Sequence, residues 1–419
     1  MTDPTSQENL AMSRNKTLSA AKSAKNDEFY TQYADIQKEI NAYLDYDPDV
    51  FRGKTVLLPC DDPEWSNFTR FFAQNFETLG LNKLISTSYA PDAKKEKYGI
   101  LFEYAAEQNG GRPKNERGKI FVLDHDANAS GRIDLDDLEW DYLEGDGDFR
   151  SEEVCKLRDE ADVIVTNPPF SLFREFLAWI IAGRNCHTDW FGPNGPHKGN
   201  DSANAVRREP IRVISKKFLI IGNMNAIKYK EVFPLIMQNR LWLGNGFNAG
   251  NAFFGLPPNA VSADYAKGVF DAETGMVKFR NCCWFTNIEH GRRHQPLQLM
   301  TERENIKYSR HKEVRGIGYR RYINFDGIEV PYVDAIPSDF DGVMGVPISF
   351  LDKFCPEQFE IVGMSLDLAE ARDEIRDWYL ARPEEKQKRT GNDTFYCRDD
   401  NGNPVRLYDR LAIRFRRGK

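Results

Sequence analysis

Apolar runs typical of buried strands alternate with amphipathic helical patterns up to about Glu289. The alternation predicts an α/β fold with a doubly wound, mostly parallel sheet and helices on both faces. Ligands of such sheets bind at the carboxyl ends of the strands. The strands are predicted at "KTVLLPC", "KLISTSY", Val163–Val165, "KKFLIIGNMNAI", "RLWLG" and "NCCWFTNI".

Start signals and periodicity define the helices of this region. Asp62 is expected to be the N-cap, with Pro63 at the first helical position, of a helix that runs to about Leu79. "GKIFVLD" and "GRIDL" predict a hairpin. Further helices are predicted in "DEFYTQYADIQKEINAYL", around "KYGILFEYAAEQ", in Leu172–Ile180 and from about Tyr229 to Asn239, whereas residues 149–159 lead into the strand at Val163–Val165.

The alternation stops near residue 290, which predicts a domain boundary. Residues 1–20 are polar and are expected to form a disordered arm. Residues 21–290 are predicted to form one domain, and residues 291–419 a second region of mixed α/β character. In that region a hairpin is expected to turn at Asn401-Gly402, with its strand pairing near "FEIVG".

Composition limits the class of protein and its partners. The chain has 419 residues, 41% of them hydrophobic, without the run of about 18 apolar residues that a membrane span needs. It also lacks a signal-peptide pattern, so a cytoplasmic protein is expected. The seven cysteines show no CxxC pair and no zinc-finger spacing, which predicts reduced thiols and no metal.

Charge is unevenly distributed on this acidic chain, whose net charge is −7. Acidic residues crowd positions 124–162, whereas residues 14–25, 292–321 and 406–419 are basic. Local basic stripes suit a polyanion held on one face, although a merely solvated surface is an equal alternative.

The segment Asn167-Pro168-Pro169-Phe170 separates a predicted strand from a predicted helix. Two prolines fix the backbone and remove two N–H donors, so the Asn167 amide and the Pro168 carbonyl point in set directions. Together these two acceptors can hold both hydrogens of a planar amino group, while Phe170 stacks on the ring that carries it. The alternative is a turn that only ends the strand.

This elbow resembles the catalytic motif of amino-methyltransferases that use S-adenosylmethionine, and its NPPF form is most similar to adenine-N6 DNA methyltransferases. Further segments, in the same order from about Ala24 to the C-terminus, resemble the EcoRI-type modification methyltransferase family. They are "DEFYTQYADIQ", "CDDPEWSNFTRFF", "GDGDFRSEE", "VTNPPFSLFREFL", "KFLIIGNMNAIKYKEVF", "DGVMGVPISFLDKFCPEQFEIV" and "LYDRLAIRFRR".

The resemblance implies a site-specific methyltransferase of a restriction-modification system. It implies a Rossmann-like sheet in residues 21–290 that binds S-adenosylmethionine, and a C-terminal target-recognition region. Asn167, Pro168, Pro169 and Phe170 would hold a flipped-out adenine. The cofactor would contact Phe29, Tyr30 and Thr31 with its carboxylate, Cys60, Asp61 and Asp62 with its ammonium group, and Asp148 and Phe149 with its adenine.

Two departures from the usual methyltransferase pattern accompany this assignment. The loop after the first strand lacks a GxG sequence, and "KLISTSYAPD" has no acid at the strand end, so no residue is assigned to the ribose.

Phosphates of double-stranded DNA are expected to contact Arg292, Arg293, Arg310, Lys312, Arg315, Arg320 and Arg321. Action as a monomer is expected, with no membrane partner, and a cognate restriction enzyme is left open.

Three other stretches have competing interpretations. Asp126 to Asp137 has oxygen side chains at calcium-loop positions, but its flank is strand-like, so a hairpin tip is favoured. Gly244 to Gly255 is either a loop at the DNA, with Phe253 or Phe254 as a second stacking plate, or part of the core. Gly183 to Pro210 is either a mobile loop or a DNA contact.

Two rival functions are distinguished by sequence features. A protein glutamine methyltransferase also uses an NPP elbow, but usually has Tyr at the position of Phe170, a GxG loop and no basic C-terminal region. A DNA-binding relic without activity is suggested by the missing glycines. DNA adenine methylation accounts for more of the sequence than either rival.

Overall fold

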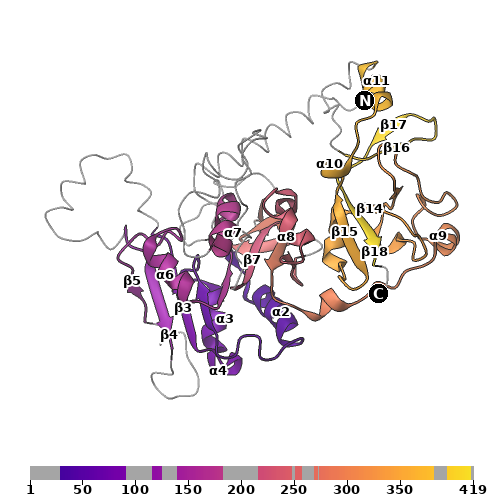
Figure 1. Ribbon diagram of the computed structural model, residues 1–419. Helices are drawn as coiled ribbons and strands as arrows, with labels where there is room; N and C mark the ends of the chain where they lie inside the picture. The colour runs from indigo at the N-terminus through magenta and orange to yellow at the C-terminus, as the bar shows by residue number, and fades with distance from the viewer. Residues whose placement is uncertain are drawn as a thin grey trace, which may run out of the picture. The chain divides into compact units, whose positions relative to one another are not determined.

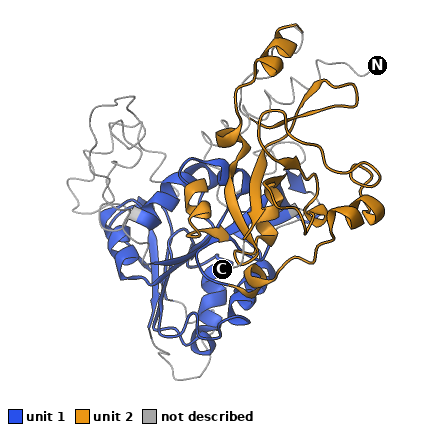
Figure 2. Cartoon of the chain, turned by 45° about the vertical axis from the view of Figure 1, so that its right-hand side comes forward, with its two compact units in different colours: residues 1–232, 243–289 blue, residues 233–242, 290–419 orange. Residues whose placement is uncertain are grey.

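The computed structural model describes residues 29–90, 116–124, 139–182, 216–247, 251–256, 269–271, 273–381 and 394–416. The chain divides into two compact units (Figure 2). Unit 1 comprises residues 1–232 and 243–289, and unit 2 comprises residues 233–242 and 290–419. Several predictions lie outside the described residues: the arm of residues 1–20, the helix around "KYGILFEYAAEQ", the strand "GRIDL", the calcium-like loop and the whole 183–210 insertion.

Eight strands of the described chain form one large mixed sheet in the order β5-β4-β3-β2-β6-β7-β12-β8. The four central strands are parallel: β3 (Lys83–Thr87), β2 (Thr55–Leu58), β6 (Val163–Thr166) and β7 (Lys217–Asn223). The flanking strands are β4 (Lys119–Leu123), β5 (Asp141–Tyr142), β12 (Cys282–Thr286) and β8 (Trp242–Leu243).

The expectation of a mostly parallel sheet is only partly correct, because antiparallel pairing begins on both sides of the central strands. β4 pairs antiparallel with β3 and with β5, and β12 pairs antiparallel with β7. Strand β12 directly follows another strand, with only Asn281 between them, instead of the crossover helix that usually returns a strand parallel to its neighbour.

Alternate residues of the central strands face opposite sides of the sheet. Val56, Leu58, Val163 and Val165 belong to one core cluster with residues of α2 (Tyr33–Leu44), α3 (Asn67–Gln74) and α4 (Phe76–Leu79). On the other face, Phe285 packs against Phe173, the first residue of α7 (Phe173–Ala182). The helix α6 (Glu152–Glu160) precedes β6 (Figure 1).

A second, antiparallel sheet of unit 1 has the order β1-β9-β11-β10. Its strands are β1 (Tyr30–Thr31), β9 (Asn251–Gly255), β11 (Met276–Arg280) and β10 (Phe270–Asp271). Tyr30 and Thr31 of "DEFYTQYADIQKEINAYL" are therefore a strand, and the predicted helix begins only at Tyr33. Backbone pairing of Thr31 with Phe254 accounts for this difference.

The helix predicted from Asp62 to Leu79 begins later and is interrupted. Ser66 is the N-cap, accepting a hydrogen bond from the Phe68 N–H, and the chain breaks between α3 and α4 at Asn75. Asp62 instead accepts the Glu64 N–H at 2.9 Å, which holds the preceding residues in a turn. The N-cap assignment of Asp62 is therefore wrong. The chain between β7 and α8 includes the 3₁₀ helix η5 (Met224–Lys228).

Unit 2 contains a four-stranded sheet in the order β13-β14-β18-β15 and a two-stranded hairpin (Figure 1). The sheet strands are β13 (Ile328–Glu329), β14 (Met344–Pro347), β18 (Arg410–Phe415) and β15 (Phe359–Met364). The hairpin pairs β16 (Tyr396–Arg398) with β17 (Pro404–Arg406) and has Gly402 at φ +83°. The predicted hairpin and the pairing of the tail with "FEIVG" are both confirmed.

Short helices complete unit 2. They are α8 (Phe233–Met237), α9 (Glu302–Tyr308), α10 (Ser365–Leu368), α11 (Asp373–Leu380) and the 3₁₀ helices η7 (Gly291–His294), η8 (Val333–Ala335) and η9 (Ile348–Lys353). The helix predicted at residues 229–239 is thus reduced to five residues.

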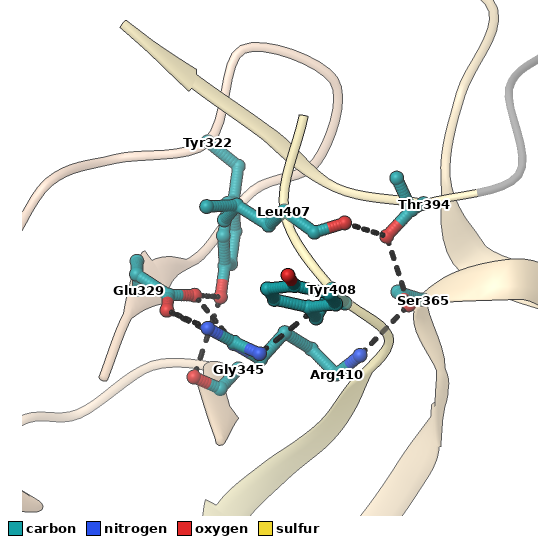
Figure 3. Close-up of polar contacts among 8 residues, drawn as sticks. All are labelled: Tyr322, Glu329, Gly345, Ser365, Thr394, Leu407, Tyr408 and Arg410. Carbon is teal, nitrogen blue, oxygen red and sulfur yellow. Dashed lines mark hydrogen bonds and ion pairs between the residues drawn. The ribbon is translucent and has the colours of Figure 1, made fainter. Parts of the chain in front are cut away.

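A buried ion pair joins β13 to β18 (Figure 3). Arg410 donates to both carboxylate oxygens of Glu329, with a shortest distance of 2.6 Å, and the Tyr322 hydroxyl donates to the same carboxylate at 2.7 Å. The Arg410 N–H donates to Ser365 at 3.0 Å. Because removing one partner leaves a buried charge unpaired, the pair is costly to break.

Glu329→Ala is expected to lower the free energy of unfolding by about 3–5 kcal/mol, which denaturant titration measures. The matched control is Glu360→Ala, which removes the ion pair with Arg414 on the same sheet. Both of those side chains are about half exposed, so we expect a loss of at most about 1 kcal/mol. Equal losses in the two variants would contradict the structural role of Glu329.

Candidate active site

Four chain segments meet at the carboxyl edge of the parallel strands in unit 1. The Asp61 N–H, after β2, donates to the Thr87 carbonyl at the end of β3 at 2.9 Å. The Ala90 N–H donates to the Asp146 carbonyl at 2.8 Å, and the Thr166 hydroxyl donates to Asp61 at 2.6 Å. The edge where ligands of α/β sheets bind therefore carries the predicted loops.

The elbow follows β6 directly and leads into the 3₁₀ helix η4 (Phe170–Leu172). The Asn167 side-chain amide nitrogen donates to the Phe29 carbonyl at 2.8 Å, which fixes the orientation of the amide. Its oxygen, Oδ1, is buried and has no hydrogen-bond partner among the described residues. A buried carbonyl oxygen without a donor is costly, so this atom is suited to accept a hydrogen bond from a ligand.

Phe170 is half-buried and is surrounded by other aromatic rings. Its ring centroid lies 6.2 Å from that of Phe29, 6.4 Å from Phe254 and 5.8 Å from Phe279. These contacts hold one part of the ring and leave another part accessible. Phe254 itself is fully buried, which supports the core interpretation of that residue.

The glycine-rich stretch that begins at Gly244 is tied to α2. The fully buried Glu39 accepts the Asn245 N–H at 2.8 Å and also the N–H of Gly246. Phe247 then stacks on Trp284, with centroids 5.6 Å apart. The described part of this stretch is thus anchored in the core, and Phe253 is half-buried in β9.

Asp61 is 5% exposed and connects the first loop to the elbow. One carboxylate oxygen accepts the Thr166 hydroxyl at 2.6 Å, and the other accepts the Ser66 hydroxyl at 2.7 Å. Burial raises the pKa of Asp61 to about 7, and the two hydroxyl hydrogen bonds oppose the rise. The carboxyl group therefore changes charge near neutral pH. It is hydrogen-bonded to Thr166, the residue that directly precedes Asn167.

The segment Phe29–Thr31 is held by two asparagines. Asn167 binds the Phe29 carbonyl, and the Asn67 side chain, at the first residue of α3, donates to the Thr31 carbonyl at 2.8 Å. The Thr31 hydroxyl is buried and has no partner among the described residues. This predicted cofactor segment and the predicted catalytic elbow are therefore in direct contact.

Asp62 and Cys60 flank Asp61 in the same loop. Lys119, from β4, lies 3.2 Å from Asp62 and 2.7 Å from Glu64. Cys60 is half-buried. The Asp62 carboxylate thus already has one cation beside it, whereas the side-chain partners of Asp61 among the described residues are two neutral hydroxyl groups.

Asp148 and Phe149 lie in the loop that precedes α6. Both oxygens of Asp148 accept hydrogen bonds from the Arg150 guanidinium, which also contacts Glu175 of α7 at 3.0 Å. Phe149 is 5% exposed, and its ring packs edge-on against Phe176 and Trp179. This geometry pairs the Asp148 carboxylate with a guanidinium and links the loop to α7.

Sequence reasoning missed several polar residues of this edge. The Thr87 hydroxyl, at the end of β3, is buried without a partner among the described residues, like Thr31 and Asn167. Thr166 and Ser66 hold Asp61, and Asn67 holds β1. The available signal was the position of Thr87 and Thr166 at the carboxyl ends of strands. Three buried polar atoms without partners fit a polar ligand such as S-adenosylmethionine.

The seven predicted DNA-contacting cations all lie in unit 2, and their surroundings differ. Arg293 is 4% exposed, is hydrogen-bonded to Asn239, and lies with its guanidinium carbon 3.7 Å from the Trp242 ring centroid. Arg292 pairs with Asp352. Both side chains are therefore occupied within the unit.

The other five predicted cations are exposed. Arg310, Arg320 and Arg321 each lie beside an acidic side chain, namely Asp334, Asp400 and Asp326. Lys312 and Arg315 form no ion pair with any residue that the structure describes.

The described part of the chain shows neither a metal-ligand cluster nor a membrane-spanning helix. No group of three or more His, Cys, Asp or Glu side chains there is placed to hold a metal ion. No helix in that part of the chain is long and apolar enough to cross a membrane.

Comparison with known families decides among the amino-methyltransferases. The model of the family described as adenine-specific methyltransferase EcoRI matches residues 17–185 and 209–416. This chain belongs to that family. The family and the activity expected from the sequence, DNA adenine methylation, are confirmed, and such methyltransferases in general use S-adenosylmethionine as the methyl donor.

Curated relatives support the assignment over most of the chain. Type II methyltransferase M.EcoRI of Escherichia coli is 37% identical over 354 residues, which cover 83% of this chain and 89% of the relative. Type II methyltransferase M.MpnI of Mycoplasma pneumoniae is 30% identical, covering 82% of this chain and 83% of the relative. Type II methyltransferase M.MgeORF184P of Mycoplasma genitalium is 28% identical over similar shares. No solved structure matches the chain significantly.

Proposed function

We propose that this methyltransferase transfers a methyl group from S-adenosylmethionine to the N6 amine of a flipped-out adenine at a specific site in double-stranded DNA. One observation carries the proposal: Asn167 Oδ1 is a buried acceptor without a partner among the described residues, at the end of a parallel strand. Adenine N6 carries the two hydrogens that such an acceptor and the Pro168 carbonyl can bind.

The catalytic roles are assigned to the elbow. Bound S-adenosylmethionine supplies an electrophilic methyl group on its sulfonium. Asn167 and the Pro168 carbonyl accept the two amine hydrogens, which directs the nitrogen lone pair out of the ring plane, and Phe170 stacks on the base. With the cofactor bound, methyl transfer to this nitrogen would leave a neutral thioether, and the amine proton would pass to solvent. Pro169 fixes the backbone into η4.

The cofactor site is proposed along the same sheet edge, within a doubly wound catalytic domain of residues 21–290. The ionised Asp61 suits the ammonium group, with Cys60 and Asp62 beside it. Phe29, Tyr30 and Thr31 are placed near the carboxylate, and Asp148 near the adenine, with Phe149 supporting its loop. The hydroxyls of Thr31 and Thr87 are further candidates for the polar groups of the cofactor.

DNA recognition is proposed for residues 291–419. The exposed Arg310, Lys312, Arg315, Arg320 and Arg321 are assigned to phosphates, and Arg292 and Arg293 to holding unit 2 together. We further propose that the enzyme acts as a monomer, which sedimentation of the enzyme–DNA complex tests. A cognate restriction enzyme in the host would recognise the same site.

Tritiated S-adenosylmethionine distinguishes this function from its rivals. The enzyme is incubated with adenine-containing duplex, with adenine-free duplex, and with a host protein extract. Label is expected only in the adenine-containing duplex. Label in protein would support a glutamine methyltransferase, and no transfer to any substrate would support a DNA-binding relic.

A further inference from the structure

Unit 2 displays an aliphatic side chain at the tip of a tight turn. Ile317 is 63% exposed and stands between Gly316, at φ +78°, and Gly318, at φ +89°. Two flanking residues in the left-handed region are unusual, and only glycine adopts such angles without strain. The turn is therefore built to reverse the chain sharply on both sides of Ile317.

The turn is firmly attached to the unit. The Ile317 and Gly318 N–H groups donate to the Val314 carbonyl at 3.1 and 2.9 Å, and the Gly316 N–H donates to the Ile306 carbonyl of α9 at 2.8 Å. Val314 is fully buried. The Ile317 side chain therefore projects from a preset backbone, which reduces the entropy lost on binding.

The base of the turn is fixed as well. His311 stacks on Tyr332, with ring centroids 3.6 Å apart, and its Nε2 lies 2.8 Å from Asp334. Lys312 and Arg315 precede Ile317 by five and two residues, and both side chains are exposed and form no ion pair with a described residue. An apolar tip with exposed cations close to it in the sequence suits a partner that offers phosphates and a stack of apolar rings.

We propose that Ile317 is a wedge that inserts between stacked base pairs of the DNA duplex while Lys312 and Arg315 bind the adjacent phosphates. Apolar side chains inserted at a base step unstack it and kink the duplex. An enzyme that must extract an adenine from the stack benefits from a preset wedge. This inference rests on the proposed placement of DNA recognition in unit 2.

The test uses duplexes that contain the recognised site, found by sequencing the modified adenines of an expressing host. A 2-aminopurine in the site reports unstacking by its fluorescence. Ile317→Ala is expected to lose most of the fluorescence rise and to methylate about tenfold or more slowly. A duplex with a mismatch or abasic partner at the target is already unstacked, and should restore the rate to within about threefold.

Matched controls separate insertion from folding. Leu380→Ala removes another exposed aliphatic side chain of unit 2, one that is 54% exposed, and should leave both signals unchanged. Gly316→Ala strains the turn that holds Ile317, so it should also lower the fluorescence rise and the methylation rate. Gly402→Ala, at φ +83° and with equally open surroundings in the C-terminal hairpin, should leave both unchanged. Lys312→Ala and Arg315→Ala should each reduce the slope of log affinity against log salt by about 1 while leaving the fluorescence rise.

The outcomes separate failure of the wedge from failure of the proposed function. A full fluorescence rise and a normal rate in Ile317→Ala would overturn the wedge while DNA methylation stands. The wedge would also be overturned if the rate defect of Ile317→Ala depended on a single thymine methyl group while the fluorescence rise stayed normal. That result would indicate that Ile317 contacts a base edge in the groove. Unchanged salt slopes would remove this surface from the DNA, and absence of DNA methylation by the wild type would refute the proposed function itself.

Discussion

Asn167→Ala is expected to lower the rate of DNA adenine methylation by about 10²- to 10³-fold while S-adenosylmethionine still binds. The variant removes Oδ1, the buried acceptor that has no partner among the described residues. It also removes the hydrogen bond to the Phe29 carbonyl. Single-turnover methylation of a duplex and calorimetric titration of the cofactor measure the two effects.

The control for this prediction is Asn67→Ala. Asn67 makes the equivalent hydrogen bond to β1, from its side chain to the Thr31 carbonyl at 2.8 Å, but it contributes nothing to the elbow. Its loss should affect cofactor affinity more than the single-turnover rate. Asn167→Asp keeps an acceptor and should retain more activity than Asn167→Ala. Rates in Asn167→Ala within about threefold of the wild type would remove the assigned role.

Asp61 is expected to make cofactor binding depend on pH near neutrality. Its pKa is raised by burial to about 7 from 3.8. The ammonium group of the cofactor binds the ionised carboxylate, and it stays cationic below pH 7. The dissociation constant should therefore rise by up to about tenfold per pH unit as the pH falls below 7. Asp61→Asn should bind weakly and flatten this dependence.

The same raised pKa predicts that the stability of the fold falls as pH rises, whereas cofactor affinity increases. Because the folded protein binds a proton more tightly than the unfolded chain does, the free energy of unfolding should fall as pH rises from about 4 to about 7, and Asp61→Asn should remove this fall. Asp45→Asn is the matched control, since Asp45 is an exposed carboxylate of unit 1 at the end of α2, and it should change neither profile. A pH-independent cofactor affinity in the wild type would contradict the role given to Asp61.

Strong local patterns predicted the central part of this protein. The β-branched run before Asn167 and the two prolines after it specify a strand and an elbow with little help from distant residues. The topology rule then brought the loops at 59–64, 146–150 and 166–170 to one edge of the sheet. The hairpin at Asn401-Gly402 was also specified locally, by its turn residues.

Features that depend on distant partners were not predictable in the same way. Tyr30 and Thr31 form a strand because β9, more than 200 residues later, pairs with them. Asp62 loses the N-cap position to Ser66 because Asp62 turns toward the Glu64 N–H. Arg293 looked like a phosphate contact in a basic run, but Trp242 and Asn239 bury it. The pattern of charges along the sequence does not show which cationic side chains are buried or paired within the fold.

Nucleoside analysis of DNA tests the central claim most directly. A duplex is incubated with trideuteromethyl S-adenosylmethionine and either the wild-type enzyme or Asn167→Ala. The DNA is then digested to nucleosides, which are separated by chromatography and identified by mass spectrometry. The wild type is predicted to yield deuterated N6-methyladenine, and Asn167→Ala almost none. Label on cytosine or on protein, or equal N6-methyladenine with both enzymes, would contradict the account.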